Sequence, residues 1–269
     1  MDTDPARTGT FPVELRGVRK RFGDLVVLDG VDFRFHDGLT TAVLGPSGTG
    51  KSVLLKHIVG LLQPDAGEVR VFGTDMARAH PEEVYAARRR IGMCFQDGAL
   101  FDSMSVGENV GFPLARHRPE LSAAQRRARV EEVLDLVELP DLYDRPVPAL
   151  SGGQRKRVGI ARAIVDQPEL VLFDEPNSGL DPLTSEAIDQ LILDMKRRLG
   201  VTFVIITHDI VGAVRVADRM AMLWQGRFIA EGTPAEVARS PHEMVRRFLG
   251  RNLVLPDAEG AVATLPGIG

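Results

Sequence analysis

Short apolar runs and amphipathic segments alternate along much of this chain. Apolar runs without alternation predict buried strands at 39–44, 91–95, 170–173 and 201–206. A helix is predicted from Pro182, because its apolar residues recur on one face, namely Ile188, Leu191, Ile192, Met195 and Leu199. Buried strands that alternate with helices are typical of a mainly parallel sheet covered on both faces, so the pattern predicts an α/β fold.

Two parts of the chain depart from this pattern. Residues 13–35 contain short β-like runs, and 219–231 reads as a possible hairpin. Between 105 and 150 there is little strand signal. Ser122 followed by Gln125 forms a capping box there, and the helix behind it has one apolar face, made of Val130, Val133, Leu134 and Val137. We therefore expect a helical subdomain, at about residues 98–165, inserted into the α/β core.

Composition narrows the classes of function. The hydrophobic content of 44% is ample for a core, and the formal net charge of −4 argues against a nucleic-acid partner, since no broad basic field would hold a phosphate backbone. The one cysteine, Cys94, excludes an internal disulfide and stands in an apolar run, as a buried thiol would. No run is long enough to span a membrane, and the first residues show no secretory signal. We expect a cytoplasmic protein whose membrane role requires a partner.

A glycine-rich loop joins the strand predicted at 39–44 to a helix predicted at 53–59. This phosphate loop matches the pattern G-x-x-x-x-G-K-[ST] with the residues Gly45, Pro46, Ser47, Gly48, Thr49, Gly50, Lys51 and Ser52. Its glycines let backbone N–H groups approach a phosphate at the positive end of the helix dipole. Lys51 can reach the β- and γ-phosphates, and the Ser52 hydroxyl can hold Mg²⁺. The loop predicts nucleoside triphosphate binding; the alternative is a glycine-rich turn that happens to fit.

Two carboxylates follow the strand predicted at 170–173. Asp174 is placed to hold the Mg²⁺ shell with Ser52, and Glu175 to polarise an attacking water, whereas a helix cap or turn is the alternative for a lone carboxylate. Ligands of such folds bind at the C-terminal ends of the strands. Residues at four predicted strand ends should therefore gather at one edge of the sheet, namely Gly45, Gln96, Asp174 and His208.

The segment 150–155 has the sequence LSGGQR, whose local interpretation is a helix start capped by Ser151. Between a phosphate loop and an Asp-Glu strand, it resembles the signature motif of ABC-type ATPases. The other motifs of that family follow in order: Phe22 as the base-stacking aromatic, Gln96 as the Q-loop, residues 178–181 (SGLD) as the D-loop and His208 as the switch histidine. Phe22 replaces the commoner tyrosine, and on its own it reads equally well as a core aromatic. The resemblance covers about residues 13–249.

The resemblance implies a phosphate-loop NTPase core with a mainly parallel sheet, N-terminal antiparallel strands and an inserted helical subdomain. It also implies that two copies pair head to tail, so that the ATP on one phosphate loop is capped by the signature motif of the other copy. The residues that it implies for ATP binding are Phe22, the phosphate loop from Gly45 to Ser52, Ser151, Gly152, Gly153, Gln154 and Asp181.

The same resemblance implies roles in catalysis. Lys51 and Ser52 hold phosphate and metal, Asp174 orders the Mg²⁺ shell, and Glu175 is the general base. His208 contacts the γ-phosphate. Gln96 senses metal and water and links the site to a membrane partner. ATP and Mg²⁺ are thus the implied cofactors.

A finer resemblance lies around the Q-loop, where residues 95–101 read FQDGALF and the similarity runs on to Asn109 and Pro113. This run, with Gly179 in the D-loop, is similar to ATPases of Mla-type and Mce-type lipid importers. It implies a subunit that powers a separate integral membrane permease from the inner face of the membrane, for phospholipid or other lipid, with lipid-binding subunits in the same complex. Leu100, Phe101 and Met104 would then meet a permease helix; the alternative is ordinary packing inside the helical subdomain.

Two other functions remain as alternatives: the ATPase of an amino-acid or metal importer, and a soluble ABC ATPase acting in DNA repair, chromosome structure or translation. The chain is expected to comprise an ATPase domain at 1–250 and a tail at 251–269. Apolar residues of the tail are interrupted by Pro256, Gly260, Pro266 and Gly267, so it is expected to form no helix or strand and to lie on another surface. Terminal disorder is the alternative.

Overall fold

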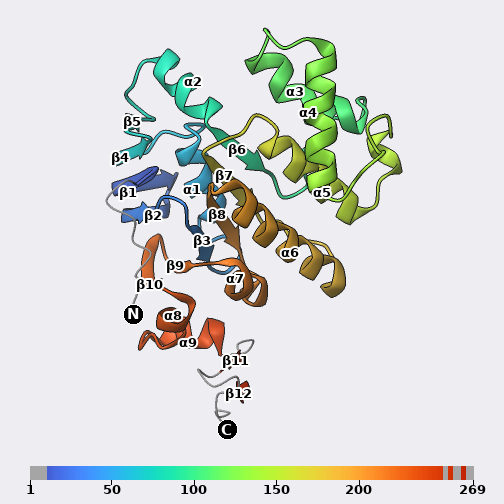
Figure 1. The fold of residues 1–269 in the computed structure, drawn as a ribbon. Coiled ribbons are helices and arrows are strands. Elements are labelled where there is room, and N and C mark those ends of the chain that lie inside the picture. The colour runs from blue at the N-terminus through green and yellow to red at the C-terminus, as the bar shows by residue number, and fades with distance from the viewer. Residues whose placement is uncertain (1–10, 251–253, 257–261, 265–269) are drawn as a thin grey trace, which may run out of the picture.

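The computed structural model describes residues 11–250, 254–256 and 262–264, and Figure 1 shows its fold. The strands are β1 (Val13–Phe22), β2 (Leu25–Phe35), β3 (Thr40–Leu44), β4 (Ala66–Val71), β5 (Thr74–Asp75), β6 (Ile91–Cys94), β7 (Leu170–Asp174), β8 (Thr202–Thr207), β9 (Arg219–Trp224), β10 (Arg227–Gly232), β11 (Val254–Pro256) and β12 (Val262–Thr264).

The helices alternate with the strands of the core, as the apolar pattern predicts. They are α1 (Lys51–Ile58), α2 (Pro81–Arg89), α3 (Val106–His117), α4 (Ala123–Leu136), α5 (Gly152–Ile164), α6 (Pro182–Leu199), α7 (Ile210–Val216), α8 (Pro234–Ala238) and α9 (Glu243–Leu249), with a short 3-10 turn η1 (Val147–Ala149). Among the described residues, no helix combines the length and the apolar character that crossing a bilayer requires.

The central element is a six-stranded sheet in the order β10-β9-β3-β8-β7-β6, which is parallel except for the antiparallel pair β9 and β10. Its register places Leu44 beside Thr207 and Asp174 beside Ile206. The segments that follow β3, β7 and β8 therefore leave the sheet at one edge. This arrangement confirms the predicted α/β fold and brings the predicted strand-end residues into reach of each other.

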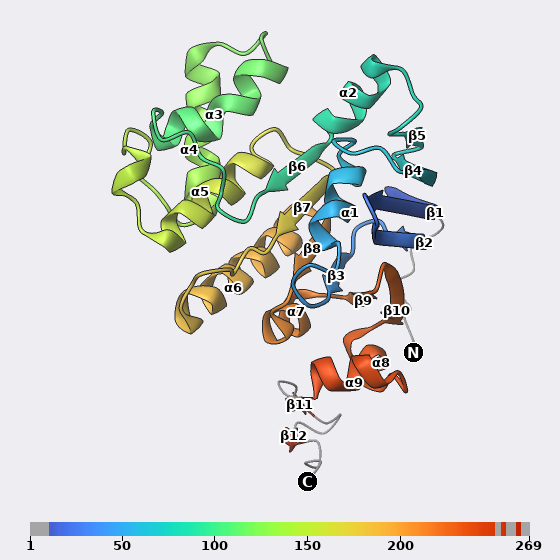
Figure 2. The same cartoon turned by 180° about the vertical axis from the view of Figure 1, so that it is seen from behind.

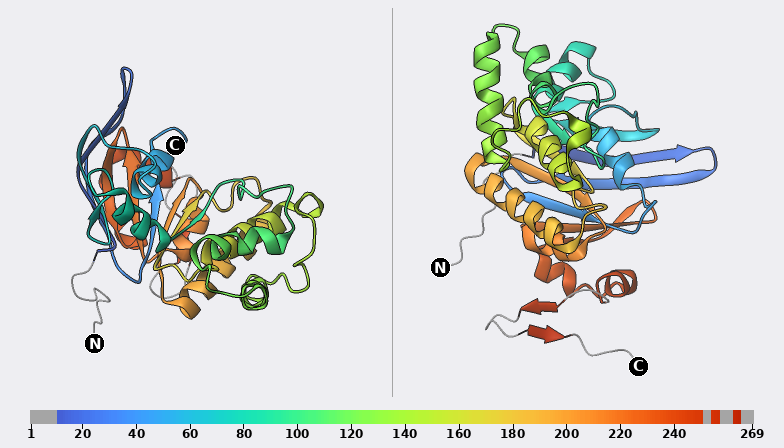
Figure 3. Two further views of the ribbon diagram at one scale, coloured as in Figure 1. Left: turned by 90° about the horizontal axis from the view of Figure 1, so that it is seen from above. Right: turned by 90° about the vertical axis from the view of Figure 1, so that its right-hand side faces the viewer.

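The two faces of this sheet are covered differently, as the two opposite views in Figures 1 and 2 show. On one face lie α1 and a four-stranded antiparallel sheet, β2-β1-β4-β5, whose buried residues share a core with Leu172 and Val204. On the other face, α3, α4, α5 and α6 pack on Phe173 and Phe203. The helical segment α3–α5 stands clear of the four-stranded sheet (Figure 3, left).

The N-terminal strands are longer than the short runs predicted from alternation. β1 and β2 form one hairpin that extends outward from the body of the protein (Figure 3, right). Register shifts lie between Leu15 and Val18, where Gly17 has a φ of 58°. Such a β-bulge lets pairing continue where the alternation of apolar and polar residues breaks, which is why the sequence pattern underestimates the strands.

The tail prediction is wrong for six residues. β11 and β12 pair antiparallel, with Pro256 opposite Val262. Pro256 is the last residue of its strand, and in a two-stranded ribbon each strand is an edge, where proline is tolerated. The rest of the predicted tail, residues 251–253, 257–261 and 265–269, lies outside the described part of the chain.

Candidate functional site

The phosphate loop leaves β3 at Gly45 and enters α1 after Gly50, and neither position has room for a side chain. Gly50, the N-cap residue of α1, has a φ of 99°, and a Cβ there would lie 2.8 Å from Val27 Cγ1. A Cβ on Gly45 would lie 2.6 Å from the carbonyl oxygen of Leu223. No side chain caps the start of α1, so its first backbone N–H groups stay open at the positive end of the helix dipole. This geometry suits a phosphate group.

Lys51 joins the loop to the carboxylate of Glu175. Its ammonium group donates to the carbonyl oxygens of Gly45 and Pro46 at 2.7 and 3.2 Å and lies 3.6 Å from Glu175 Oε1. Burial lowers the pKa of Lys51 from its ordinary value, and the neighbouring Glu175 works in the opposite direction. The lysine is thus held at the mouth of the loop as a cation next to a carboxylate.

Ser52 and Asp174 form the pair predicted to hold Mg²⁺. The Ser52 hydroxyl donates to Asp174 Oδ1 at 3.3 Å, across from α1 to the end of β7. Burial raises the pKa of Asp174, while the Ser52 hydrogen bond lowers it. A hydroxyl and a carboxylate are hard oxygen ligands of the kind that Mg²⁺ uses in phosphate sites, so these two residues fit that ion.

Glu175 follows β7 in a strained left-handed conformation, with a φ of 50°. Its N–H donates to the Ile206 carbonyl at 2.9 Å. Its Oε2 atom accepts from the Thr207 hydroxyl and the His208 N–H, each at 3.2 Å, and lies 2.9 Å from His208 Nδ1. These contacts from β8 fix a carboxylate beside the open end of α1. The sequence analysis did not identify Thr207. The feature that could have indicated it is its position at the end of a buried strand, directly before His208.

A pocket of about 440 Å³ brings many of the predicted residues together, although Gly45 and Asp174 do not line it. Its lining includes Phe22, Ser47, Gly48, Gly50, Lys51, Ser52, Gln96, Glu175 and His208. The Phe22 side chain is 47% exposed at the end of β1, so Phe22 belongs to this site and not to the core. The Gln96 amide nitrogen donates to the Ser178 hydroxyl of the D-loop at 3.2 Å.

The signature motif and Asp181 do not line this pocket. Ser151 caps α5 and accepts from the Gln154 N–H at 3.2 Å, while Gln154 Oε1 accepts from the Ser151 N–H at 3.0 Å. Asp181 caps α6, and hydrogen bonds from Thr184 lower its pKa. A Cβ on Gly153 would lie 2.7 Å from Thr184 Cγ2. Within the described residues these groups therefore form a second cluster, at the joined starts of α5 and α6.

Comparisons with known proteins cover most of the chain. The family model described as ABC transporter matches residues 28–178. A probable ribonucleotide transport ATP-binding protein of Mycobacterium leprae (strain TN) is 38% identical over 244 residues, which are 91% of this chain and 70% of that protein. A sulfate/thiosulfate import ATP-binding protein of Mycolicibacterium paratuberculosis (strain ATCC BAA-968 / K-10) is 41% identical over 261 residues, or 96% of this chain and 67% of the relative.

The fold also matches solved structures. A dimeric ATP-binding cassette in a post-hydrolysis state, bound to ADP and Pi, superposes with a TM-score of 0.75 at 34% sequence identity. The match covers 82% of this chain and 98% of that cassette.

Proposed function

This chain belongs to the ABC transporter family and is an ATPase, and we propose that its ATP hydrolysis powers a separate membrane permease. The observation that carries the proposal is an apolar groove of about 420 Å³ beside the Q-loop, here defined as residues 96–99. It lies next to the pocket that binds ATP. A partner bound in this groove would be moved by any change that ATP binding or hydrolysis causes in the Q-loop.

We propose that the pocket holds ATP together with Mg²⁺. Phe22 stacks on the base, the open end of α1 and Lys51 bind the phosphates, and Ser52 and Asp174 hold the metal. When bound, Mg²⁺ neutralises charge on the phosphates and so lowers the cost of attack. Gln96 would offer its amide oxygen to the metal shell, since its amide nitrogen is the atom that donates to Ser178.

In hydrolysis, Glu175 is the general base. It takes a proton from the attacking water while the water oxygen bonds to the γ-phosphorus and the bond to the leaving oxygen breaks. Its contacts with Thr207 and His208 hold the carboxylate in place, since both residues stand at the end of β8. The His208 side chain is 56% exposed, so its other ring nitrogen can face the γ-phosphate while Nδ1 stays at the Glu175 carboxylate.

We further propose that two copies bind ATP between them. Ser151 and Gly152 are exposed, and the signature motif does not line the pocket of its own chain. The start of α5 from the other copy would cap the γ-phosphate. Gly153, Gln154 and Asp181 lie in the same region, where the starts of α5 and α6 meet. The relation to a cassette solved as a dimer supports this arrangement.

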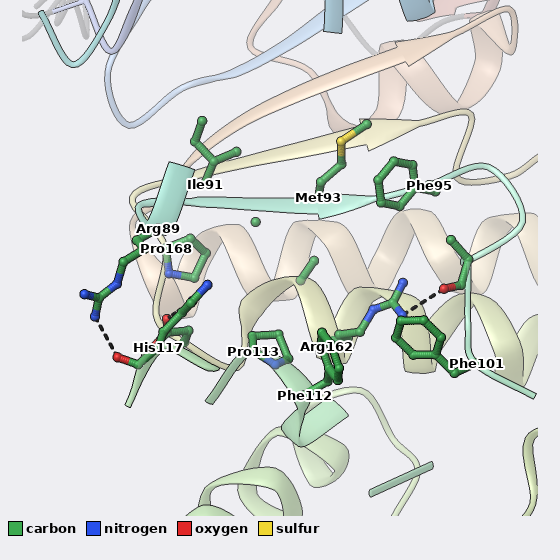
Figure 4. A pocket seen from close by; sticks show the side chains of 14 residues that line it. Arg89, Ile91, Met93, Phe95, Phe101, Phe112, Pro113, His117, Arg162 and Pro168 are labelled. Atoms are coloured by element: carbon green, nitrogen blue, oxygen red, sulfur yellow. Dashed lines mark hydrogen bonds and ion pairs between the residues drawn. The ribbon is translucent and has the colours of Figure 1, made fainter. Parts of the chain in front are cut away.

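The groove has one wall from β6 and the following loop, with Ile91, Met93 and Phe95, and another from α3, with Phe112 and Pro113 (Figure 4). Phe101 and Phe112 remain 42% and 38% exposed, with their ring centroids 5.1 Å apart. Exposed aromatic side chains in a groove are suited to a partner that desolvates them. We therefore assign the groove to a cytoplasmic helix of the permease.

The expectation for Leu100 changes. Leu100 is half-buried against the core of the helical segment, so its substitution would test folding and not docking. Phe101 and Phe112 are the residues to change.

The substrate that we propose is phospholipid or another lipid. The support is the FQDGALF run at 95–101, which lines this groove in part and is similar to Mla-type and Mce-type importer ATPases. The named relatives carry ribonucleotide and sulfate descriptions, so an importer of another solute is the second candidate. We place the protein peripherally at the inner face of the membrane, held by its permease and its lipid-binding subunits. We further propose a 1–250 ATPase domain with a helical subdomain at about 98–165.

The experiment changes Phe101 and Phe112 together to serine and tests recovery of the permease from detergent-solubilised membranes. We expect at least a tenfold loss of permease, with ATP binding retained, because the apolar contact is removed while the pocket is intact. The control is Leu61→Ser, which changes an exposed apolar side chain outside the groove.

Permease recovery at the level of the control would refute docking at the groove. A recovered permease that belongs to an amino-acid or metal importer would refute the lipid substrate and leave the ATPase assignment intact.

A further inference from the structure

Helix α5, which begins with the signature motif, carries three residues spaced three apart that face the Q-loop. They are Lys156, Gly159 and Arg162, and this spacing puts them on neighbouring positions of one helix surface. The Q-loop is thus held along the side of the helix whose first turn carries Ser151. A displacement of the start of α5 would therefore also displace the contact between α5 and the Q-loop.

Lys156 contacts both the Q-loop and the residue that follows β7. Its side chain is only 6% exposed, and its ammonium group donates to the Gln96 carbonyl and, at 3.3 Å, to the Glu175 carbonyl. Burial lowers the pKa of Lys156, while Asp97, Glu175 and Asp174 act in the opposite direction. A buried cation of this kind must be paired with hydrogen-bond acceptors, and here the acceptors are two backbone carbonyls.

The other two residues complete the seat of the loop. A Cβ on Gly159 would lie 3.2 Å from Gly98 Cα, so glycine permits the close approach of helix and loop. Arg162 donates to the carbonyls of Gly98 and Ala99 at 2.5 and 2.9 Å. The carbonyls of Gln96, Gly98 and Ala99 in the Q-loop therefore accept from cations of α5.

The backbone of Glu175 is fixed from both sides. Its N–H donates to Ile206 on β8, and its carbonyl accepts from Lys156 and from the Ser178 N–H. Its φ of 50° costs free energy and persists because these contacts over-determine it. If the Lys156 contact is lost, one of the restraints that aim the carboxylate is lost with it.

We propose that Lys156 is a positioning residue for ATP hydrolysis, which ties the aim of Glu175 and the Q-loop to the seating of the signature helix α5. The proposal rests on the proposed role of Glu175 as general base. In a dimer, the nucleotide that binds the start of α5 belongs to the other copy. Lys156 then lets that nucleotide influence hydrolysis in this chain.

The test compares Lys156→Met with Arg157→Met in the full chain. Arg157 is the matched control, because it is the next residue of α5 and also donates to a backbone carbonyl, that of Val137, inside the helical segment. We expect Lys156→Met to lower kcat about 10- to 100-fold, as a misplaced catalytic group does, with KM for ATP changed less than about threefold. Lys156→Arg, which keeps donors and charge, should recover most of the rate.

Hydrogen exchange gives a second readout that does not depend on turnover. Exchange should rise at 96–99 and 175–178 in Lys156→Met and stay at the wild-type level there in Arg157→Met. If the methionine variant does not fold, Lys156→Gln replaces it in both measurements.

An unchanged kcat in Lys156→Met, or an equal loss in Arg157→Met, would overturn the proposal. A parallel Glu175→Gln variant separates the two levels of the argument. Normal turnover in Glu175→Gln refutes the base assignment, and with it the proposed tie to that carboxylate. Loss in Glu175→Gln with normal turnover in Lys156→Met refutes only the role of Lys156.

Discussion

The starts of α1 and α5 are both predicted to bind phosphate, yet they are built differently. At α1 the N-cap is Gly50, in a left-handed conformation and without a side-chain cap, so its N–H groups are open within the pocket of their own chain. At α5 the Ser151–Gln154 capping box satisfies one N–H group at each end of the box. The residues of this second start do not line the pocket.

A helix start with a side-chain cap has hydrogen-bond acceptors of its own, whereas an uncapped start leaves its N–H groups available to a phosphate. The α1 end is surrounded by Lys51, Asp174 and Glu175, the groups that we propose for phosphate, metal and water. At the α5 end lie its own cap and the neighbouring Asp181 cap of α6. We infer that α1 supplies a binding site and α5 supplies a lid for another copy.

The largest expected effect comes from Glu175→Gln. The amide keeps the shape of the carboxylate but cannot accept a proton, so hydrolysis should fall by about 10²–10⁴-fold while ATP binding remains. With ATP trapped at the α1 start, two copies should accumulate as a dimer on a sizing column. Lys51→Ala is the contrasting variant, since it should lose nucleotide affinity itself. Normal turnover without an ATP-dependent dimer would contradict both the role of Glu175 as general base and the role of α5 as a lid for another copy.

An intermediate effect is expected from Ser151→Ala. Loss of the cap should lower the free energy of unfolding by about 0.5–2 kcal/mol, measured by denaturant titration. ATP affinity of the single chain should stay the same, because Ser151 does not line the pocket.

The ATP-held dimer of Glu175→Gln should dissociate at least tenfold more readily when Ser151→Ala is added, as expected from the loss of one hydrogen bond to a charged group, worth about 1.5–3 kcal/mol. A dimer of undiminished affinity would show that the α5 start does not meet ATP.

The smallest expected effect is a difference in how Asp174, beside the α1 start, and Asp181, beside the α5 start, make folding stability depend on pH. Burial raises the pKa of Asp174 above 3.8, so its contribution to folding stability is present below 3.8 and lost as pH rises through the folded value. Hydrogen bonds from Thr184 hold the pKa of Asp181 below 3.8, so its contribution is present above 3.8 and lost as pH falls.

Asp174→Asn should therefore melt no lower than the wild type at pH 8 in the absence of nucleotide, and Asp181→Asn should melt lower there. Melting temperatures that shift in the same direction for the two variants would contradict the electrostatic difference between the two helix starts.

The fold class followed from the sequence because its signals are local. Apolar runs, glycine placement and capping residues act over three or four neighbours, so Ser122 with Gln125, and Ser151, cap their helices as predicted. The phosphate loop is local for the same reason. The order of the motifs along the chain indicated the family, and the comparisons show that membership.

Contacts that cross the sheet were beyond the sequence. Spacing along the chain says that Glu175 and His208 each follow a strand, but only the pairing of β7 with β8 brings His208 Nδ1 within 2.9 Å of the carboxylate. The same holds for Phe22, which reads equally as core or site until β1 and β2 pair as a hairpin and leave it exposed.

Lys156 is the furthest from prediction, since within LSGGQRKR nothing distinguishes it from its basic neighbours. The packing of α5 against the Q-loop selects it, by burying one lysine where two carbonyls converge. The sequence by itself determined the elements, the phosphate loop and the helix caps, because these depend on neighbours a few residues apart. Tertiary structure alone decided which side chains share the catalytic site, because burial and strand order join residues that the chain keeps far apart.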